Sequence, residues 1–297
     1  MRPLRSLLFV PGHREGWAEK AVNAGVDAVI LDLEDSVPES LKDLGRATVA
    51  ATIPALRAAH PELGIYVRVN ALETGLSGDD IAAVALPGLD GFVLPKLYGP
   101  EDVIRIDALV THFEPKNGVE PGAIEFIPCL ESAQAYESCA EIVTCSPRVA
   151  TLFAGTARDA DVSRSVGFRF TPTGQETLFL RSRALLACRA HGKDFPLTGV
   201  WQDLTDDAGA RDFAERNRDI GFRGMFLIHP KHAGLVNEVF SPSEQDVKFY
   251  ADMIAAFDTA VADGKAAVSY EGMHVDYAHI KTAREVLAYA EQLKVGA

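Results

Sequence analysis

Short apolar runs alternate with amphipathic helical patterns along most of this chain, and this alternation constrains the fold more than any other feature. Eight runs, rich in β-branched and aromatic residues and bounded by turn residues, lie at 6–12, 27–35, 64–70, 91–96, 124–132, 149–155, 195–201 and 224–230. Apolar strands that alternate with helices indicate a parallel sheet covered by helices. Eight such units before residue 231 predict an α/β fold of the TIM-barrel type.

The competing architecture is a doubly wound sheet, which usually carries a glycine-rich phosphate turn after its first strand. Here the first run leads into VPGHREG, which does not match GxGxxG. Ionisable or polar residues follow nearly every predicted strand, and in a barrel these strand ends converge on the face where active sites lie. They are His13, Arg14, Glu34, Asp35, Arg68, Asn70, Lys96, Glu131, Asp159, Asp161, Asp203 and His229.

The chain continues after the eighth run for longer than a minimal barrel requires. We expect a barrel domain over residues 1–240 and a C-terminal helical extension over 241–297. The extension contains helical segments, a short strand-like piece at 267–270 and a closing amphipathic helix. The pattern alone leaves two roles open: a lid or arm onto a neighbouring subunit, and a plain helix that covers the barrel.

Composition argues against several classes of partner. The formal net charge is −13 and no basic stripe stands out, so we expect no nucleic-acid partner. No apolar run approaches the length of a membrane span, and the N-terminus lacks a signal-peptide pattern. The four cysteines form no CxxC pair, which predicts reduced thiols. We therefore expect a soluble cytoplasmic protein that contacts no membrane.

Carboxylates at consecutive strand ends predict a divalent-cation site. Glu131 follows the fifth predicted strand, and Asp159 and Asp161 follow the sixth. Converging carboxylates that leave positions for water suit a hard cation such as Mg²⁺. The cation would also relieve the repulsion between Glu34 and Asp35, which could accept hydrogen bonds from metal-bound waters. Each acid taken singly is equally well a solvated loop residue, so the metal hypothesis rests on the whole set.

Three further residues around these acids have more than one interpretation. Arg68 lies in an otherwise buried strand and suits bidentate capture of a substrate carboxylate, or else an ion pair with Glu34 or Asp35. Lys96 suggests a Schiff-base lysine, although we favour an ion pair with the acidic cluster. We expect Asp32 to point away from Glu34 and Asp35 and to have a structural role, because alternate strand residues face opposite sides.

The chain resembles the citrate lyase β-subunit-like family in motifs that follow one another in the order RSLLFVPG, DAVILDLEDSVPESLKDLGR, YVRVN, VLPK, ESA and GFRGMFLIHPKHAGLVNEVFSPSEQDV. That family belongs to the HpcH/HpaI aldolase superfamily and includes malyl-CoA and citramalyl-CoA lyases. The resemblance spans Arg5 to about Leu287. The resemblance is specific because it combines two motifs that rarely occur in one chain. The first is DLEDSVP with Lys42 and Arg46 after it, and the second is IHP with a segment like NEVFSP after it.

The resemblance implies a TIM barrel that holds Mg²⁺ through one glutamate and one aspartate. The glutamate maps onto Glu131 of ESA, and the aspartate onto Asp161, which lies six positions before a glycine. The loop before it is longer than in the family pattern, so Asp159 stays an alternative ligand. Arg68 maps onto the arginine that holds the substrate carboxylate, and Gly155 and Asp161 are also placed at the substrate.

The resemblance also implies a homotrimer or a higher homo-oligomer. In lyases of this family an aspartate from the C-terminal segment of an adjacent subunit completes the site, and Asp276 in YEGMHVDYAHIKTAREVLAYA matches it. This favours the lid interpretation of the extension. Glu34 and Asp35 match acids that hydrogen-bond metal-bound waters, and Lys96 is expected beside them.

Together these residues predict Mg²⁺-dependent cleavage of a carboxylated 3-hydroxyacyl-CoA thioester, of the malyl-, citramalyl- or citryl-CoA type, to a 2-oxo acid and acetyl-CoA. Arg68 would fix the carboxylate, and Asp276 would protonate the enolate carbon. The cations around the first strand are then candidates for binding CoA, although an ordinary solvated turn explains them equally well. They are Arg5, His13, Arg14 and Lys20.

Other functions remain open. They are a citrate lyase β subunit that acts on a citryl thioester of an acyl-carrier protein, a malyl-CoA thioesterase, a non-catalytic barrel that binds a dicarboxylate, and a Schiff-base aldolase through Lys96. The sequence does not name the acyl substrate. The candidate wall residues for its pocket are Leu72, Leu97 and Phe153.

Overall fold

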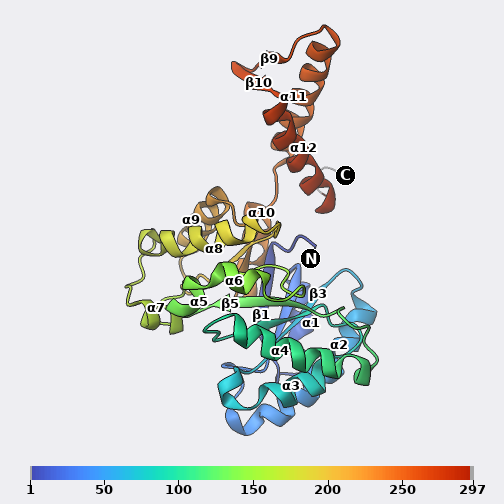
Figure 1. Ribbon diagram of the computed structural model, residues 1–297, viewed down its shortest axis with the longest axis vertical. Helices are drawn as coiled ribbons and strands as arrows, with labels where there is room; N and C mark the ends of the chain where they lie inside the picture. Colours follow the sequence, from blue (N-terminus) through green and yellow to red (C-terminus); the bar gives the residue numbers. More distant parts are fainter. Residues whose placement is uncertain (1, 295–297) are drawn as a thin grey trace. The chain divides into compact units, whose positions relative to one another are not determined.

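The computed structural model describes residues 2–294, and its largest feature is a closed barrel of eight parallel strands in sequential order (Figure 1). The ring closes where β8 pairs with β1, with Ser6 opposite Met225. The prediction of a TIM barrel is confirmed. The strands are β1 (Ser6–Pro11), β2 (Ala28–Asp32), β3 (Gly64–Arg68), β4 (Gly91–Leu94), β5 (Glu125–Leu130), β6 (Phe153–Ala154), β7 (Leu197–Thr198) and β8 (Gly224–Leu227).

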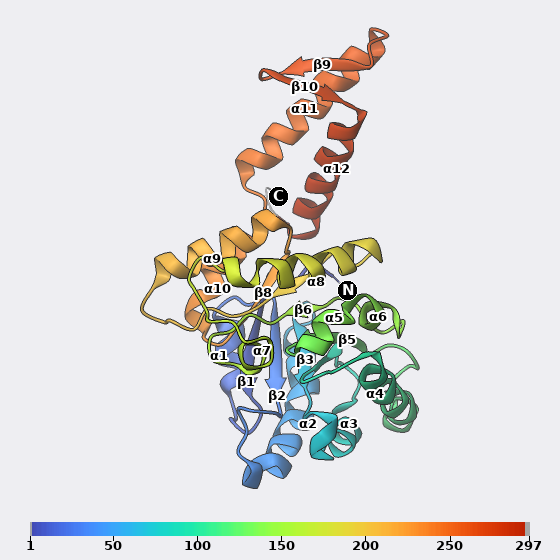
Figure 2. The same ribbon diagram turned by 60° about the vertical axis from the view of Figure 1, so that its left-hand side comes forward.

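Helices surround the ring on its outside, as Figures 1 and 2 show. They are α1 (Trp17–Asn23), α2 (Lys42–Ala59), α3 (Ser77–Val84), α4 (Pro100–Phe113), α5 (Ala133–Glu137), α6 (Cys139–Thr144), α7 (Asp161–Val166), α8 (Leu178–Ala190), α9 (Asp207–Ile220) and α10 (Ala233–Val239). Short 3₁₀ turns lie at Glu39–Leu41, Leu72–Thr74, Pro115–Asn117, Gln175–Thr177 and Pro230–His232. The helices cover the outer face of the sheet, which explains why the strands read as continuous apolar runs.

The inside of the barrel is a packed apolar core. Phe226 stacks on Phe153 with ring centroids 4.0 Å apart and meets Phe9 edge to face. Gly224 opens β8, where a Cβ atom would lie 2.1 Å from the carbonyl oxygen of Leu4. Only glycine therefore lets β8 approach the start of the chain and close the ring. Large buried members of this core are Leu7, Ile30, Tyr66, Val93, Ile127, Phe153, Leu197 and Phe226.

A buried ionic network ties the end of α4 to the segment before β6. Arg148 places its two terminal nitrogens 2.6 Å from the carboxylate oxygens of Glu114, and its Nε donates to Asp107 at 2.7 Å. Glu114 also accepts the backbone N–H groups of Gly122 and Ile124. The network fixes the start of β5 from outside the barrel.

The contacts between residues divide the chain into two compact units, Met1–Glu238 and Val239–Ala297. The second unit contains α11 (Glu244–Ala262), a hairpin of β9 (Ala267–Tyr270) and β10 (Met273–Asp276), and α12 (Tyr277–Gln292). Figure 2 shows α11 beside α12 and the hairpin beside α11. This unit has an apolar core of its own, formed by Met253, Phe257, Val275, Ile280 and Ala283.

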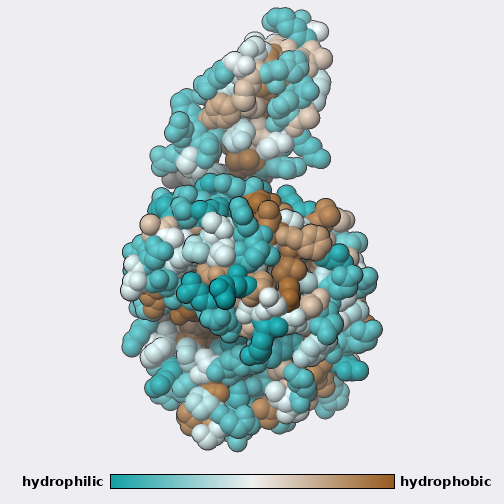
Figure 3. Space-filling model, turned by 90° about the vertical axis from the view of Figure 1, so that its left-hand side faces the viewer, coloured by the Kyte–Doolittle hydropathy of each residue, from teal (hydrophilic) through white to brown (hydrophobic). Residues whose placement is uncertain are grey.

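The surface of the barrel unit is mainly hydrophilic, with separate hydrophobic patches (Figure 3). The most exposed large apolar side chains are Phe179 and Leu186 of α8, which keep 72% and 70% of their surface in solvent. Among the residues that the structure describes, no helix has the length and apolar character needed to cross a membrane.

Candidate active site

A cavity of about 450 Å³ lies at the carboxyl ends of the barrel strands. Four acids line it, Asp32, Asp35, Glu131 and Asp161, and Arg68 is the one cation among its described lining residues. The remaining wall is mostly apolar or small: Phe9, Pro11, Phe153, Gly155, Ala157, Ala160, Val162, Val200 and Ile228. The cavity thus brings together Arg68, Glu131, Gly155 and Asp161, which the sequence predicts at the site.

Arg68 is held in place by the strand next to its own. The parallel register sets Asp32 of β2 beside Arg68 of β3. The Nε and Nη2 atoms of Arg68 each donate to an oxygen of Asp32 at 2.7 Å, and its Nη1 lies 2.9 Å from Glu34. The guanidinium also lies over the ring of Phe9, 4.5 Å from its centroid. Burial lowers the pKa of Arg68, but the Asp32 and Glu34 carboxylates raise it overall.

The prediction that Asp32 points away from the acidic pair is wrong. Asp32 and Glu34 are two positions apart, so they face the same side, and both contact Arg68. Asp35 is more exposed, with 60% of its side chain in solvent, and it lines the cavity together with Asp32. Asp32 is fully buried, and although burial raises its pKa, the Arg68 guanidinium lowers it overall. Its structural role is therefore to hold Arg68 at the cavity.

Lys96 joins the two acids that follow β2. Its Nζ lies 2.6 Å from Glu34 and donates to Asp35 at 2.8 Å. Burial lowers the pKa of Lys96, but the hydrogen bonds to Asp35 and Glu34 raise it overall, so the amine stays protonated. A protonated amine is not the nucleophile that a Schiff-base aldolase needs. The backbone of Lys96 has a positive φ of 49° and donates its N–H to Glu131 at 3.2 Å.

Glu131 carries a pKa raised to about 7. Burial is the main cause, and the negative charges of Glu34 and Asp161 add to it, while Arg68 and the Lys96 N–H act in the opposite direction. Both carboxylate oxygens of Glu34 are buried, and each lies within ion-pairing distance of a cation, Lys96 for one and Arg68 for the other. The acids at this end of the barrel still outnumber these two cations, and the local excess of negative charge suits a bound cation.

Two carboxylates on one wall fit Mg²⁺, which typically takes one or two protein carboxylates and keeps water or substrate oxygens in its other positions. Within residues 2–294 no group of three or more His, Cys, Asp or Glu side chains could form a complete protein cage. Asp161 is the first residue of α7 and lines the cavity with Glu131, although it also contacts Arg164. Asp159 is exposed, has φ of 54° and is not among the lining residues.

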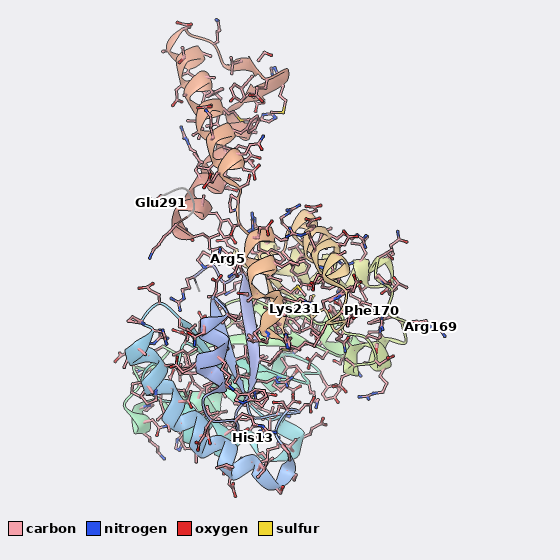
Figure 4. The ribbon with its side chains drawn as sticks, turned by 180° about the vertical axis from the view of Figure 1, so that it is seen from behind. Arg5, His13, Arg169, Phe170, Lys231 and Glu291 are labelled. Carbon is pink, nitrogen blue, oxygen red and sulfur yellow. The ribbon has the colours of Figure 1, made fainter. Side chains whose placement is uncertain are left out.

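The cations around β1 do not form one group. Arg5 precedes β1 and binds Asp27 through Nε at 2.8 Å and Nη2 at 2.7 Å, whereas His13 follows the carboxyl end of β1. Figure 4 shows Arg5 and His13 at opposite ends of the barrel unit. The six residues of β1 separate them by about 20 Å. Arg5 therefore lies apart from the cavity end of β1 and is paired with Asp27, so the structure gives its predicted contact with CoA no support, and that contact stays a prediction.

The other cations of that group lie at the cavity end of β1. Arg14 and Lys20 are exposed, and the charge of each lies 5.7 Å from the ring centroid of Trp17. Burial and the charge of Arg14 lower the pKa of His13, and its Nδ1 has no hydrogen-bond partner among the described residues. This exposed indole with two cations close to its ring can contact an anionic, aromatic ligand.

The candidate wall residues divide between two cavities. Phe153 lines the main cavity, whereas Leu72 and Leu97 line a neighbouring one of about 290 Å³. The prediction that Leu72 and Leu97 border the same pocket as Phe153 is therefore wrong. The sequence interpretation also missed Thr156, a buried residue of the main cavity directly after Gly155. The one feature of the sequence that could have identified Thr156 is its position directly after the sixth apolar run.

Asp276 belongs to the second unit and begins α12. Its Oδ1 accepts the backbone N–H of Ala278 at 3.0 Å and lies 2.7 Å from Nδ1 of His279. The hydrogen bond with His279 is the main reason why the pKa of Asp276 is lowered, and the N–H groups of the helix start add to it. The side chain keeps 44% of its surface exposed, so a carboxylate is presented to solvent at the tip of a helix.

Known proteins resemble this chain along nearly its whole length. The model of the HpcH/HpaI aldolase/citrate lyase family matches residues 5–230. The chain is 35% identical to the L-malyl-CoA/beta-methylmalyl-CoA lyase of Cereibacter sphaeroides, over 98% of this chain and 96% of that protein. It is 33% identical to the (3S)-malyl-CoA thioesterase of the same species, with the same coverage.

Solved structures include the protein CitE of Mycobacterium tuberculosis in complex with magnesium, acetoacetate and coenzyme A. It matches with a TM-score of 0.75 and 25% sequence identity, over 97% of this chain and 98% of that chain. The similarity therefore includes the second unit as well as the barrel.

Proposed function

The chain belongs to the HpcH/HpaI aldolase/citrate lyase family, and from this premise we propose that it is a Mg²⁺-dependent carbon–carbon lyase. Its substrate is a carboxylated 3-hydroxyacyl-CoA thioester, which it cleaves to a 2-oxo acid and acetyl-CoA. The observation that carries the proposal is one cavity in which Glu131, Asp161 and Arg68 meet at the carboxyl ends of the strands. The lyase relative and the magnesium and coenzyme A complex of CitE support the same chemistry.

Glu131 and Asp161 are the residues that would hold Mg²⁺. When bound, the metal supplies a Lewis acid that polarises the hydroxyl and carboxylate oxygens of the substrate. Glu34 contacts Arg68 and Asp35 lines the cavity, and their carboxylates would accept hydrogen bonds from metal-bound waters. Lys96 forms an ion pair with each of these acids and so holds them in position.

Arg68 is suited to hold the substrate carboxylate. Asp32 and Glu34 fix the plane of its guanidinium, and part of its set of N–H donors stays available towards the cavity. A planar fork that is already oriented loses little freedom when it binds a carboxylate. The apolar wall of Phe9 and Phe153 excludes water around this contact and strengthens it.

Asp276 is the residue that we propose for proton transfer to and from the α-carbon of the thioester. Its lowered pKa keeps it ionised at neutral pH, which is the form that removes a proton from acetyl-CoA in the condensation direction. In cleavage the substrate hydroxyl loses its proton as the carbonyl of the 2-oxo acid forms, and Asp276, in its protonated form, delivers a proton to the enolate carbon, so the overall reaction neither consumes nor releases protons. We propose that Asp276 acts in the site of an adjacent copy, as part of a lid, in a homotrimer or a higher oligomer.

Phe179 and Leu186 lie seven positions apart on α8, so these two exposed apolar side chains share one helix face, and such a face supports an association of subunits. We also propose a cytoplasmic location, which the four free thiols of the described chain support. Arg14 and Lys20, which both lie close to the ring of Trp17, are the proposed contacts of the CoA nucleotide, together with His13.

A second candidate function is hydrolysis of malyl-CoA, which the thioesterase relative at 33% identity favours. It would use the same cavity with water as the nucleophile. A citryl thioester on an acyl-carrier protein is less well supported, because the extra carboxylate of citrate would face a cavity lined by four acids and, within the described chain, one cation.

The deciding experiment is an assay of malyl-, citramalyl- and citryl-CoA with Mg²⁺ that follows 2-oxo acid, acetyl-CoA and free CoA separately. A lyase releases 2-oxo acid and acetyl-CoA in equal amounts, and EDTA or Glu131→Gln abolishes both. Free CoA without 2-oxo acid would identify a thioesterase instead. Inactivation by borohydride in the presence of substrate, with activity intact in EDTA, would favour Lys96 and exclude the metal mechanism.

A further inference from the structure

Thr156 follows β6 and Gly155 and lies inside the wall of the main cavity. Only 1% of its surface is exposed, and its Oγ1 has no hydrogen-bond partner among residues 2–294. The residue lines the same cavity as Arg68, Glu131 and Asp161. A buried hydroxyl without a partner costs stability, so its retention at this position needs an explanation.

Other buried threonines of the barrel are satisfied by the fold itself. Thr151 donates to the carbonyl of Phe195 at 2.9 Å, and Thr198 donates to the side chain of Asn217 at 3.2 Å. Thr177 donates to the carbonyl of Gly174 at 3.2 Å. Thr156 differs from them because it borders the cavity and its hydroxyl is left unused by the protein.

Two glycines pack closely around Thr156. Gly155 precedes it, and Gly199 lies across from it, at the end of β7. A Cβ atom on Gly199 would come within 2.9 Å of the Thr156 nitrogen and 3.2 Å of Oγ1. Glycine at position 199 therefore spares the buried hydroxyl a contact that any other side chain would make with it.

We propose that Thr156 is a substrate-binding residue whose Oγ1 donates a hydrogen bond to an oxygen of the oxo-acid half of the substrate. The inference rests on the proposed function, because that function places a small, oxygen-rich acid between Arg68 and the two carboxylates. Thr156 and Ser36 are the two residues with a hydroxyl among the described lining of the cavity. The Thr156 hydroxyl adds a directional hydrogen bond to a substrate oxygen other than the one that Arg68 of β3 binds.

The test uses the full-length, Mg²⁺-loaded protein and measures the binding of pyruvate and of glyoxylate by calorimetry. Thr156→Val keeps the shape and removes the hydroxyl, and we expect it to weaken binding of the preferred oxo acid about tenfold to a hundredfold, the range for a hydrogen bond to a charged group. Its melting temperature without ligand should equal or exceed that of the wild type. Thr156→Ser, which restores the hydroxyl, should recover most of the lost affinity.

Thr151→Val is the matched control, because it removes a satisfied hydroxyl from the same barrel away from the cavity. It should lower the melting temperature and leave the oxo-acid affinity unchanged. The inference is overturned if Thr156→Val binds both oxo acids as tightly as the wild type while the wild type cleaves a thioester. A wild type that neither binds an oxo acid nor cleaves a thioester would overturn the proposed function, and the role of Thr156 with it.

Discussion

Arg68 is oriented before any substrate reaches it, and the residue that orients it is Asp32. The bidentate contact needs both a buried carboxylate and a register that sets the two side chains on neighbouring strands. A substrate carboxylate then meets a donor plane whose direction is fixed. Positioning of this kind reduces the entropy that the substrate must lose on binding.

Asp32→Asn should therefore reduce activity without touching a metal ligand or the substrate. We expect kcat/KM to fall about tenfold to a hundredfold, because a small displacement of a positioning group has effects of this size. Steady-state assays with the preferred thioester measure it. Asp27→Asn breaks a similar contact with Arg5 at the other end of the barrel and should cost stability alone. Equal losses of activity in the two variants would contradict the role of Asp32.

The choice of metal ligand is also a question at the scale of single residues. Asp161→Asn should weaken Mg²⁺ binding by about tenfold or more, because a neutral amide replaces an anionic ligand of a hard cation. Asp159→Asn should leave the Mg²⁺ affinity unchanged, since Asp159 is exposed outside the cavity. Calorimetric titration of both variants compares them directly. If Asp159→Asn weakened Mg²⁺ binding more than Asp161→Asn did, Asp159 would be the metal ligand.

Single residues show where sequence reasoning succeeds and where it fails. The placement of Glu131, Asp161 and Arg68 in one cavity follows from strand ends alone, because a barrel gathers its carboxyl ends on one face. The contact between Asp32 and Arg68 depends on register, which alternation along one strand does not reveal. The orphaned hydroxyl of Thr156 depends on what surrounds it in space, so no pattern of neighbouring residues could identify it.

At the scale of elements, apolar runs locate all eight strands but overestimate some of their lengths. The run at 149–155 contains only a two-residue strand, Phe153–Ala154, and an isolated bridge between Phe126 and Val149. The run at 195–201 is paired only over Leu197–Thr198. Burial makes both runs apolar, whereas hydrogen-bond pairing sets the length of a strand. At β6 and β7 the buried segment is longer than the paired segment.

The link between α4 and the segment before β6 predicts sensitivity to acid. Burial raises the pKa of Glu114, but Arg148 and the backbone N–H groups of Gly122 and Ile124 lower it overall. The stabilisation is therefore complete above the ordinary carboxyl pKa of 4.5 and is lost as the pH falls through the lowered value. Urea unfolding between pH 3 and pH 7 should show this loss below about pH 4.5.

Glu114→Gln should remove that part of the pH dependence and leave Arg148 without its main anion. We expect a loss of about 3 kcal/mol in the free energy of unfolding at neutral pH, because a buried charge loses its partner. Glu62→Gln, at a side chain that is 89% exposed, is the control and should change little. An unchanged acid transition in Glu114→Gln would assign the sensitivity to other carboxylates.

At the scale of the whole molecule, the proposed site needs residues from two copies of the chain. Asp276→Asn and Glu131→Gln should each be nearly inactive, the first with substrate binding largely intact and the second without Mg²⁺ binding. Dissociated and reassembled together, they should regain activity, because some sites then combine an intact barrel with an intact Asp276. Random mixing of equal amounts gives about a quarter of the wild-type sites.

The mixing experiment separates the two possible origins of Asp276. If Asp276 serves the barrel of its own chain, every site in the mixture keeps one defect and the mixture stays inactive. Asp276→Asn protein that is dissociated and reassembled alone gives the baseline activity of the procedure. Analytical ultracentrifugation of the same samples reports the number of subunits.

The apolar core of the second unit has a consequence for how the family can diversify. Met253, Phe257, Val275 and Ile280 pack with one another, so substitutions in the barrel wall leave their packing undisturbed. Selection can then reshape the pocket that recognises an acyl group while the helix start that presents Asp276 is inherited unchanged, and the reverse also holds. In this way, a few local substitutions can separate relatives with the same scaffold into lyases and thioesterases.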